Sequence, residues 1–314
     1  MELLIQFSIL ILSLAALVFF ADKLIDSSAK LAKAFGITEA VIGLTLLSYG
    51  TSLPELAVSS ISSVSDHPQL SISNVIGSNI FNVALVFGLA AYIRSFTVKE
   101  AHMAGRDNYI MVVTTLLLVA LIFFFGVISR TTGFIMILLL AGYTYYLLRH
   151  DRTSNQLKKD GTVSKPREIG IVIACLLVVI ISGRFAVDSA VQVAKGLGVT
   201  EWLIGATIIA AGTSLPELAV SITAAKKGFF GMSVGNIVGS NIFNIMWILG
   251  FAASLSPIYM NFDMIKWDSV FLLAVTFLLA YHLVRTRVSR SDGILYLAIY
   301  LGYIIYLLFF NNLS

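Results

Sequence analysis

The stretch GTSLPELAV at residues 50–58 occurs a second time, unchanged, at residues 212–220. A shorter stretch, GSNIFN, is also present twice, at 77–82 and at 239–244. Both pairs are separated by 162 positions, so a single alignment of the chain with itself accounts for both. This agreement indicates that the chain is a duplication of one unit.

Weaker matches extend the alignment to the ends of the two units. Near those ends the offset becomes 160, which pairs Gly142-Tyr143 with Gly302-Tyr303. A polar stretch without long apolar runs separates the two copies. We therefore expect three parts: a first repeat at 1–149, a linker at 150–168 and a second repeat at 169–314.

The composition is that of an integral membrane protein. Hydrophobic residues make up 58% of the 314 residues and charged residues 12%, whereas soluble domains have about 25% charged residues. The protein is therefore expected to lie in the lipid bilayer of the cell membrane. The net charge of +4 comes from Lys and Arg in short loops, which fits membrane topology better than a nucleic-acid partner. Cys175 is the one cysteine, so neither a disulfide nor a thiolate metal site is expected within one chain.

Apolar runs bounded by charged residues, Gly or Pro predict the membrane spans. They give an all-α fold of ten transmembrane helices, at about 3–33, 38–65, 70–93, 108–127, 132–149, 169–195, 200–225, 231–255, 268–284 and 293–311. Each repeat then holds five spans. Because five is odd, the second repeat must cross the bilayer in the opposite sense, which is the inverted-repeat architecture of secondary transporters.

The basic residues predict the orientation of these spans. Lys and Arg gather on the side that holds the linker 150–168, whereas the other side has only Arg130, Lys195 and Lys266. Short cytoplasmic loops are rich in Lys and Arg. We therefore expect the linker to be cytoplasmic and both termini to be extracellular.

The repeated motif places a stripe of oxygen-bearing side chains inside the second span. Positions 48, 51, 52 and 55 follow the i, i+3, i+4, i+7 spacing of one helix face. They are occupied by Ser48, Thr51, Ser52 and Glu55, and the next span adds Ser78 and Asn82, which are four residues apart. The second repeat has Ala210, Thr213, Ser214, Glu217, Ser240 and Asn244 at the equivalent positions.

Pro54 and Pro216 lie in the middle of their spans, where proline removes a backbone donor and breaks the helix. Gly50 and Gly212 loosen the same turn. Two broken helices from inverted repeats are expected to bring carbonyl oxygens, hydroxyls and carboxylates to one point near the bilayer midplane.

Glu55 and Glu217 are the strongest functional candidates. A carboxylate at the centre of a span is costly unless something pairs with it, and no basic residue lies at that depth in the neighbouring spans. The partner is then a proton or a bound cation. A site of carboxylate, carbonyl, amide and hydroxyl oxygens suits hard ions such as Ca²⁺ and Na⁺.

At these motifs the sequence resembles the calcium/cation antiporter superfamily, and within it the prokaryotic sodium/calcium exchangers. The resemblance covers the whole chain and rests on GTSLPE at 50–55 and 212–217 and GSNIFN at 77–82 and 239–244. It implies ten helices, three sodium sites around one calcium site, and alternating access by sliding of the first and sixth helices. The proton-coupled branch typically has a GNxxE-type motif, which is absent here.

The resemblance also implies a ligand set. Calcium would be held by the carboxylates of Glu55 and Glu217 and the backbone carbonyls of Thr51 and Thr213. The sodium sites would use Thr51 and Thr213 again, the carbonyls of Ser48 and Ala210, and Ser52, Ser214, Ser78 and Ser240, with Asn82 and Asn244 at the centre. Some members of the family have Asp where this chain has Asn244, and the amide there is typical of potassium-independent exchange.

Two other classes of function compete with an antiporter. A passive cation channel also needs oxygens at the midplane, but channels commonly form symmetric pores from several chains. An intramembrane hydrolase could use Ser52 or Ser214 as its nucleophile. It would also need a base, but the four histidines lie in loops or at a span end. We therefore expect a transporter rather than an enzyme, without a cofactor.

The sequence thus predicts a secondary active antiporter that exchanges sodium for calcium by alternating access, with three Na⁺ for each Ca²⁺ and one net charge moved. Proton/calcium or potassium-dependent exchange is the alternative. The chain is expected to function as a monomer.

Overall fold

The computed structural model describes residues 2–65, 68–97, 102–151, 164–199 and 210–309. Within these ranges the protein is built from long helices, of which eight are long and apolar enough to cross a membrane. The number is nine if a bent helix pair near the N-terminus counts as one span. The chain is therefore a multi-pass membrane protein.

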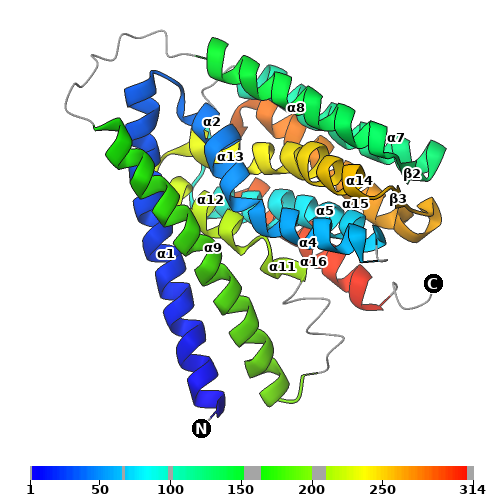
Figure 1. The fold of residues 1–314 in the computed structure, drawn as a ribbon. Coiled ribbons are helices and arrows are strands. Elements are labelled where there is room, and N and C mark those ends of the chain that lie inside the picture. Colours follow the sequence, from blue (N-terminus) through cyan, green and yellow to red (C-terminus); the bar gives the residue numbers. More distant parts are fainter. Residues whose placement is uncertain (1, 66–67, 98–101, 152–163, 200–209, 310–314) are drawn as a thin grey trace.

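Two long helices, α1 (Glu2–Phe35) and α9 (Lys165–Gly196), lie side by side at one edge of the molecule (Figure 1). Each begins one of the two predicted repeats. Their buried faces share a hydrophobic cluster that includes Leu24 of α1 and Val179 of α9. Cys175 belongs to the same cluster, as expected for a small packing residue.

The first repeated motif forms the bent helix pair. The segment comprises α2 (Glu39–Ile42), a π-helical turn η1 (Gly43–Leu47), α3 (Ser48–Thr51) and α4 (Leu53–Val64). The helix axis bends by 47° between Glu39–Thr51 and Leu53–Val64, with Ser52 at the corner. Pro54 lies in the first turn of α4, where its missing N–H does no harm. The predicted break is confirmed.

The second copy has the same break, between α11 (Ala210–Gly212) and α12 (Leu215–Lys227). Ser214 has φ −92° and ψ 11°, close to the φ −84° and ψ 9° of Ser52. Residues 200–209, which belong to the predicted span 200–225, lie outside the described residues. The ten predicted spans are therefore not all found in the described part of the chain.

The GSNIFN motifs lie on the most buried helices. The helix that holds the first motif comprises α5 (Pro68–Ile80), η2 (Phe81–Phe87) and α6 (Gly88–Ile93). The helix that holds the second comprises α13 (Phe230–Phe243), η5 (Asn244–Leu249) and α14 (Gly250–Leu255). Both helices change to π-helical turns at the motif, around Asn82 and Asn244. Such local changes in winding are frequent at functional sites.

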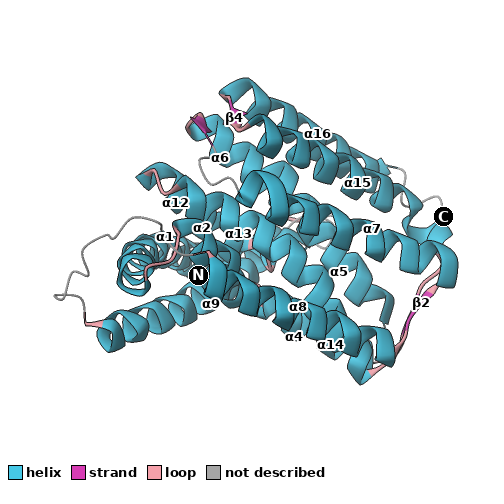
Figure 2. Cartoon of the chain, turned by 90° about the horizontal axis from the view of Figure 1, so that it is seen from above, coloured by secondary structure: helices cyan, strands magenta, loops and turns pink. Residues whose placement is uncertain are grey.

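The remaining helices cover the outside of this core (Figure 2). They are η3 (Met103–Asp107) with α7 (Asn108–Phe125), α8 (Arg130–His150), α15 (Phe262–Arg285) and α16 (Arg290–Phe309). Their outer faces expose large apolar residues such as Phe124, Leu138 and Leu301. Exposed apolar faces of this kind suit contact with lipid.

The all-α prediction misses two short antiparallel ladders. Strand β1 (Phe96–Thr97) pairs with β4 (Arg287–Val288), and β2 (Val127–Ile128) pairs with β3 (Ile258–Tyr259). Strands of two residues leave no alternating pattern in a sequence. Each ladder joins a loop of one repeat to a loop of the other.

Two predicted helix starts are wrong. The expected span 108–127 is preceded by η3, so helical structure begins at Met103. The expected span 268–284 begins at Phe262, because the Asn261 side chain accepts a hydrogen bond from the Asp263 backbone N–H and caps the helix. Lys266 therefore lies within α15 rather than in a loop. Of the predicted linker, residues 152–163 lie outside the described residues.

Candidate cation site where the repeated motifs meet

The two repeated motifs bring their polar stripes together in the interior. Ser48, Thr51, Ser52 and Glu55 of the first stripe are all 0% exposed. The second repeat contributes Ser214, Glu217, Ser240 and Asn244, each at most 1% exposed. The helix breaks at Ser52 and Ser214 place each glutamate in the first turn of a new helix, α4 or α12. The site is therefore formed by the two corners.

A reciprocal pair of hydrogen bonds joins the two corners. Ser214 Oγ donates to Glu55 Oε1 over 2.9 Å, and Ser52 Oγ donates to Glu217 Oε1 over 3.0 Å. The donors and the acceptors are each 162 positions apart, so one contact repeats the other. The two carboxylates consequently lie at one place, as the sequence predicted.

The second oxygen of each carboxylate has no hydrogen-bond partner among the described residues. Glu55 Oε2 and Glu217 Oε2 are buried and accept no hydrogen bond from the described residues. The same holds for the Oγ atoms of Ser78 and Ser240, Thr213 Oγ1, both polar atoms of the Asn82 side chain, and Asn244 Oδ1. Buried polar atoms without partners cost about 1–3 kcal/mol each. Of the 17 such atoms among the described residues, eight lie on predicted site residues, where bound cations would give the oxygens partners.

The donor set identifies the class of ion. Among the predicted site residues, all the unpartnered atoms but Asn82 Nδ2 are oxygens, from carboxylates, hydroxyls and amides. In the described part of the chain, no group of three or more His, Cys, Asp or Glu residues could hold a metal ion. Hard cations such as Na⁺ and Ca²⁺ fit oxygen ligands, whereas zinc and copper prefer nitrogen and sulfur.

Some predicted residues use their side chains for packing. Ser48 Oγ donates to the carbonyls of Gly43 and Asn236, and Thr51 Oγ1 donates to the Leu47 carbonyl over 3.0 Å. The roles predicted for Ser48 and Ala210 involve only their backbone carbonyls. Ala210 is the first residue of α11, and its side chain lies outside the described residues.

Asn79 is a site residue that sequence reasoning missed. Its Oδ1 accepts a hydrogen bond of 2.9 Å from Asn244 Nδ2, and its Nδ2 donates to the Asn241 carbonyl over 3.2 Å. These bonds orient the Asn244 amide so that its oxygen stays unpartnered. The signal was present, because Asn79 is the third residue of the repeated GSNIFN motif.

A second matched pair of bonds braces the helices behind the site. Asn74 Nδ2 donates to Ser59 Oγ over 3.0 Å, and Asn236 Nδ2 donates to Ser221 Oγ over 2.9 Å. These four residues are also related by the offset of 162. The same side-chain geometry thus surrounds both halves of the site.

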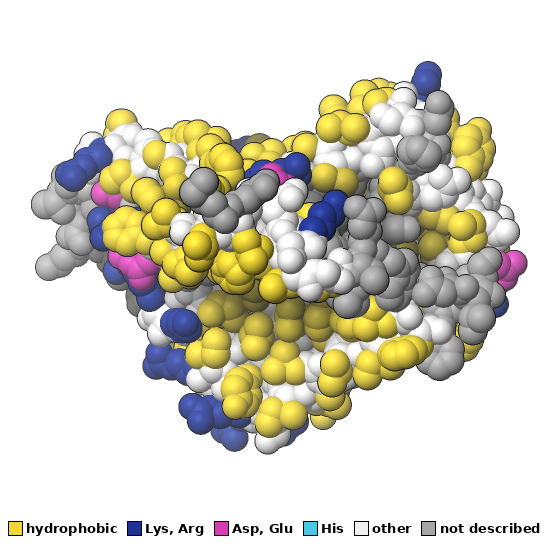
Figure 3. Space-filling view, turned by 90° about the horizontal axis from the view of Figure 1, so that it is seen from below, with side chains coloured by type: hydrophobic (Ala, Val, Ile, Leu, Met, Phe, Trp, Pro, Cys, Tyr) yellow, Lys and Arg dark blue, Asp and Glu magenta, His cyan; other side chains and the backbone are white. Residues whose placement is uncertain are grey.

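A cavity of about 1030 Å³ reaches the site from one side. Its walls come from α4, α5, α9, α15 and α16, and its lining includes Thr213 and Gly212 at the second corner. The hollow is visible from below, with hydrophobic side chains on its walls (Figure 3). Thr213 is the predicted site residue that lines this cavity.

The chain matches the sequence model of a known protein family over most of its length. The family is described as sodium/calcium exchanger protein, and the match covers residues 5–149 and 168–309. The two matched stretches coincide closely with the two repeats predicted from the sequence.

Two curated relatives match over most of their length. The inner membrane protein YrbG of Escherichia coli is 33% identical over 81% of both chains. The sodium/calcium exchanger MaX1 of Methanosarcina acetivorans is 28% identical over 97% of this chain and 99% of its own.

Solved structures of the sodium-calcium exchanger NCX_Mj have the same fold. A structure soaked with 10 mM Na⁺ and no Ca²⁺ aligns with a TM-score of 0.85 and 28% identity, over 98% of this chain and 99% of that one. Another, soaked with 100 mM Na⁺ and 10 mM Sr²⁺, aligns with a TM-score of 0.86. Similarity in fold therefore extends over the whole described architecture.

Proposed function

Since this chain belongs to the sodium/calcium exchanger family, we propose that it is a secondary active antiporter that exchanges sodium for calcium across the membrane. The observation that carries the proposal is the reciprocal bonding of Ser52 to Glu217 and of Ser214 to Glu55. It holds two carboxylates together and leaves one oxygen of each unpartnered. Two carboxylates balance the charge of one Ca²⁺.

The proposed calcium ligands are the carboxylates of Glu55 and Glu217 and the backbone carbonyls of Thr51 and Thr213. The flanking sodium sites use the carbonyls of Ser48 and Ala210 and the oxygens of Thr51, Thr213, Ser52, Ser214, Ser78 and Ser240, with Asn82 and Asn244 at the centre. The buried, unpartnered oxygens of Ser78, Ser240 and Thr213 support this assignment. The carbonyl ends of half-helices are also common ligands for Na⁺ in transporters.

Competition for the same carboxylates explains the exchange. Sodium and calcium both need Glu55 and Glu217, so they do not occupy the site together. Empty carboxylates resist crossing a dry barrier because an unpaired charge in the membrane is costly. Only a loaded site then changes access from one side to the other. With three Na⁺ for each Ca²⁺, one net charge moves per cycle and the membrane potential drives calcium out of the cell.

The architecture that supports alternating access is a pair of inverted five-helix repeats, 1–149 and 169–314, joined by a cytoplasmic linker at 150–168. Matched contacts favour it. Strands β1 and β3 are equivalent in the two repeats, and so are β2 and β4. The β1–β4 ladder therefore repeats the β2–β3 ladder with the two repeats exchanged. We place both termini outside the cell and assign the movement to α1 and α9. One chain contains the complete site, so it functions as a monomer.

Calcium flux into proteoliposomes tests this function. An outward sodium gradient should drive Ca²⁺ uptake, and gradients of potassium or protons of the same size should not. Uptake driven by protons alone contradicts sodium coupling. Flux that does not saturate and needs no counter-ion indicates a channel instead.

A further inference from the structure

A cluster of ion pairs joins α1 to the last turn of α12. Lys227 is the last residue of α12, and its Nζ lies 2.8 Å from Asp22 Oδ1 and 2.6 Å from Asp26 Oδ1. The same ammonium group donates to the backbone carbonyl of Asp22 over 3.1 Å. Asp22 and Asp26 are four residues apart, so they lie one turn apart on one face of α1. One lysine is thus held by three oxygens of another helix.

This contact is not repeated with the two repeats exchanged. The positions equivalent to Lys227 and its two partners hold Ser65, Arg184 and Asp188. Ser65 carries no charge, and Arg184 Nε donates to Asp188 Oδ2 over 2.9 Å within the same helix, α9. The ion pairs of Lys227 therefore distinguish one end of the otherwise matched repeats from the other.

The cluster lies at the end of a closed seam between α1 and α12. Leu24 of α1 and Val220 and Ala224 of α12 are each 0% exposed and belong to one hydrophobic cluster. Val220, Ala224 and Lys227 follow the i, i+4, i+7 spacing of one helix face. Glu217 lies in the first turn of α12, which is about 15 Å along the helix from Lys227. The seam therefore runs from the ion pairs toward the cation site.

The ion pairs fix the position of α1 along this seam. Apolar packing alone has no direction, so it allows one helix to slide on another. A slide of α1 by one turn, about 5.4 Å, would carry at least one of the two aspartates away from Lys227. At the same end, Lys30 Nζ lies 3.6 Å from Glu168 Oε1 of α9, so α1 is also joined to α9 there.

We propose that Lys227, Asp22 and Asp26 form an ion lock that holds α1 against α12 and keeps the seam closed on the face of the protein where α12 ends. The cation site opens toward this face only after the lock has separated. The three side chains are between 23% and 45% exposed. Partly exposed ion pairs are weak, so the lock biases the two access states and still permits exchange. This inference rests on the proposed alternating access, with movement of α1 and α9.

The test measures the half-saturating Ca²⁺ concentration at each face in oriented proteoliposomes. Lys227→Gln removes the lock and should favour the state that is open toward the Lys227 face. The half-saturating concentration at that face should fall by about two- to fivefold, and the value at the opposite face should rise. The two values change in opposite directions because apparent affinity depends on the fraction of the protein open to each face.

Matched variants isolate the contact from the charge. Lys226→Gln removes the same charge from the neighbouring residue, which is exposed and forms no ion pair among the described residues, and should leave both values unchanged. Lys227→Arg keeps the charge and should keep the wild-type values. Asp22→Asn combined with Asp26→Asn should reproduce the effect of Lys227→Gln and add nothing to it, because the three residues act through one contact.

A cross-link tests the movement itself. Asp26→Cys combined with Lys227→Cys places one thiol on each side of the lock. A short bifunctional thiol reagent should stop Ca²⁺ flux in this variant, and reduction of the cross-link should restore it. The same reagent should not affect either single-cysteine variant, which covers reaction at the buried Cys175.

The inference is overturned if Lys227→Gln leaves both half-saturating concentrations unchanged or moves them in the same direction. It is also overturned if Lys226→Gln has the same effect as Lys227→Gln, or if the cross-linked protein exchanges calcium as fast as the reduced protein. A wild-type protein without sodium-driven calcium flux would instead contradict the proposed function, so the two failures are distinguishable.

Discussion

Ser52 Oγ donates a hydrogen bond of 3.0 Å to Glu217 Oε1, so the corner of one broken segment holds the carboxylate of the other. The equivalent bond from Ser214 to Glu55 has a length of 2.9 Å. Each glutamate is thus positioned by the opposite repeat. A site made in this way is complete only when both motifs are intact.

Removing the charge of either glutamate should abolish calcium exchange. Glu55→Gln and Glu217→Gln keep the shape of the side chain, and the amide oxygen can still accept the serine hydrogen bond. The loss of charge removes half of the balance for Ca²⁺. In buffer without Na⁺ or Ca²⁺, both variants should melt at or above the wild-type temperature, because an unpaired buried carboxylate destabilises the fold. A variant with near-normal flux would show that the site is misplaced.

The free hydroxyls of Ser78 and Ser240 should matter for binding but not for folding. Neither hydroxyl has a hydrogen-bond partner in the described structure, so Ser78→Ala and Ser240→Ala break no protein contact. We expect a higher half-saturating Na⁺ concentration and an unchanged melting temperature.

Ser221→Ala is the matched control for these two variants. Ser221 Oγ accepts a bond from Asn236, and its loss leaves a buried amide unpaired at a cost of about 1–3 kcal/mol. This variant should melt at a lower temperature and keep its sodium affinity. The assignment of the sodium sites is wrong if Ser78→Ala and Ser240→Ala leave the sodium dependence unchanged.

Calcium exchange should not require potassium. Asn244 has an amide in place of a third carboxylate, and its Nδ2 donates to Asn79 Oδ1. The remaining charge, from Glu55 and Glu217, is balanced by one Ca²⁺ alone. Sodium-driven flux measured with and without K⁺ on the calcium side should be equal. An absolute requirement for K⁺ would contradict this account of Asn244.

Close packing of α13 against α2 and η1 should be sensitive to one methyl group. A Cβ atom on Gly235 would lie 2.6 Å from the Ala40 carbonyl oxygen, which is backbone and cannot move aside. Gly235→Ala should therefore cost about 1–3 kcal/mol of stability. Gly142→Ala is the control, because nothing lies within 4 Å of its Cβ position, and alanine favours helix over glycine. Equal melting temperatures for the two variants would contradict the packing described here.

The main parts of the site could be predicted from the sequence because the repeat supplies what a single motif lacks. Glu55 alone is a costly buried charge, but the identical Glu217 in a second proline-broken segment indicates a shared site. Ser52 and Ser214 were predicted on the same helix face as the glutamates, and the structure shows that each binds the glutamate of the other repeat.

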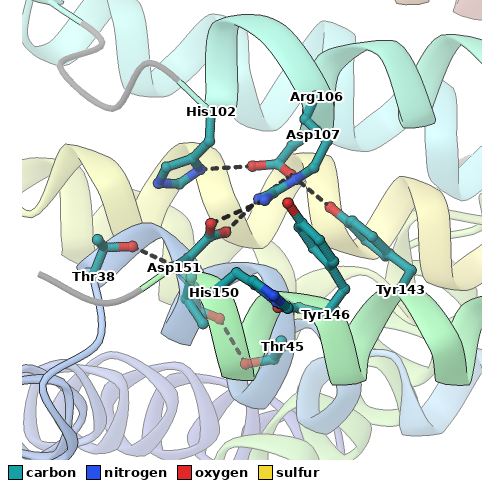
Figure 4. Close-up of polar contacts among 10 residues, drawn as sticks. Thr38, Thr45, His102, Arg106, Asp107, Tyr143, Tyr146, His150 and Asp151 are labelled. Atoms are coloured by element: carbon teal, nitrogen blue, oxygen red, sulfur yellow. Dashed lines mark hydrogen bonds and ion pairs between the residues drawn. The ribbon is translucent and has the colours of Figure 1, made fainter.

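Features set by tertiary contacts could not be predicted in the same way. The two-residue strands exist only because distant loops meet. The start of α15 depends on the cap at Asn261, which hydropathy does not show. The contacts of Asp107 with Arg106, His102 and Tyr143 also appear only when these residues are placed in space (Figure 4).

Calcium binding to the purified protein tests the central claim most directly, that Glu55 and Glu217 together form one site that sodium and calcium share. Isothermal titration calorimetry in Na⁺-free buffer should show one Ca²⁺ bound per chain. Added Na⁺ should compete with it, and Glu55→Gln and Glu217→Gln should each lose the binding. Calcium that still binds to either variant with wild-type affinity, or that Na⁺ does not displace, would contradict the account.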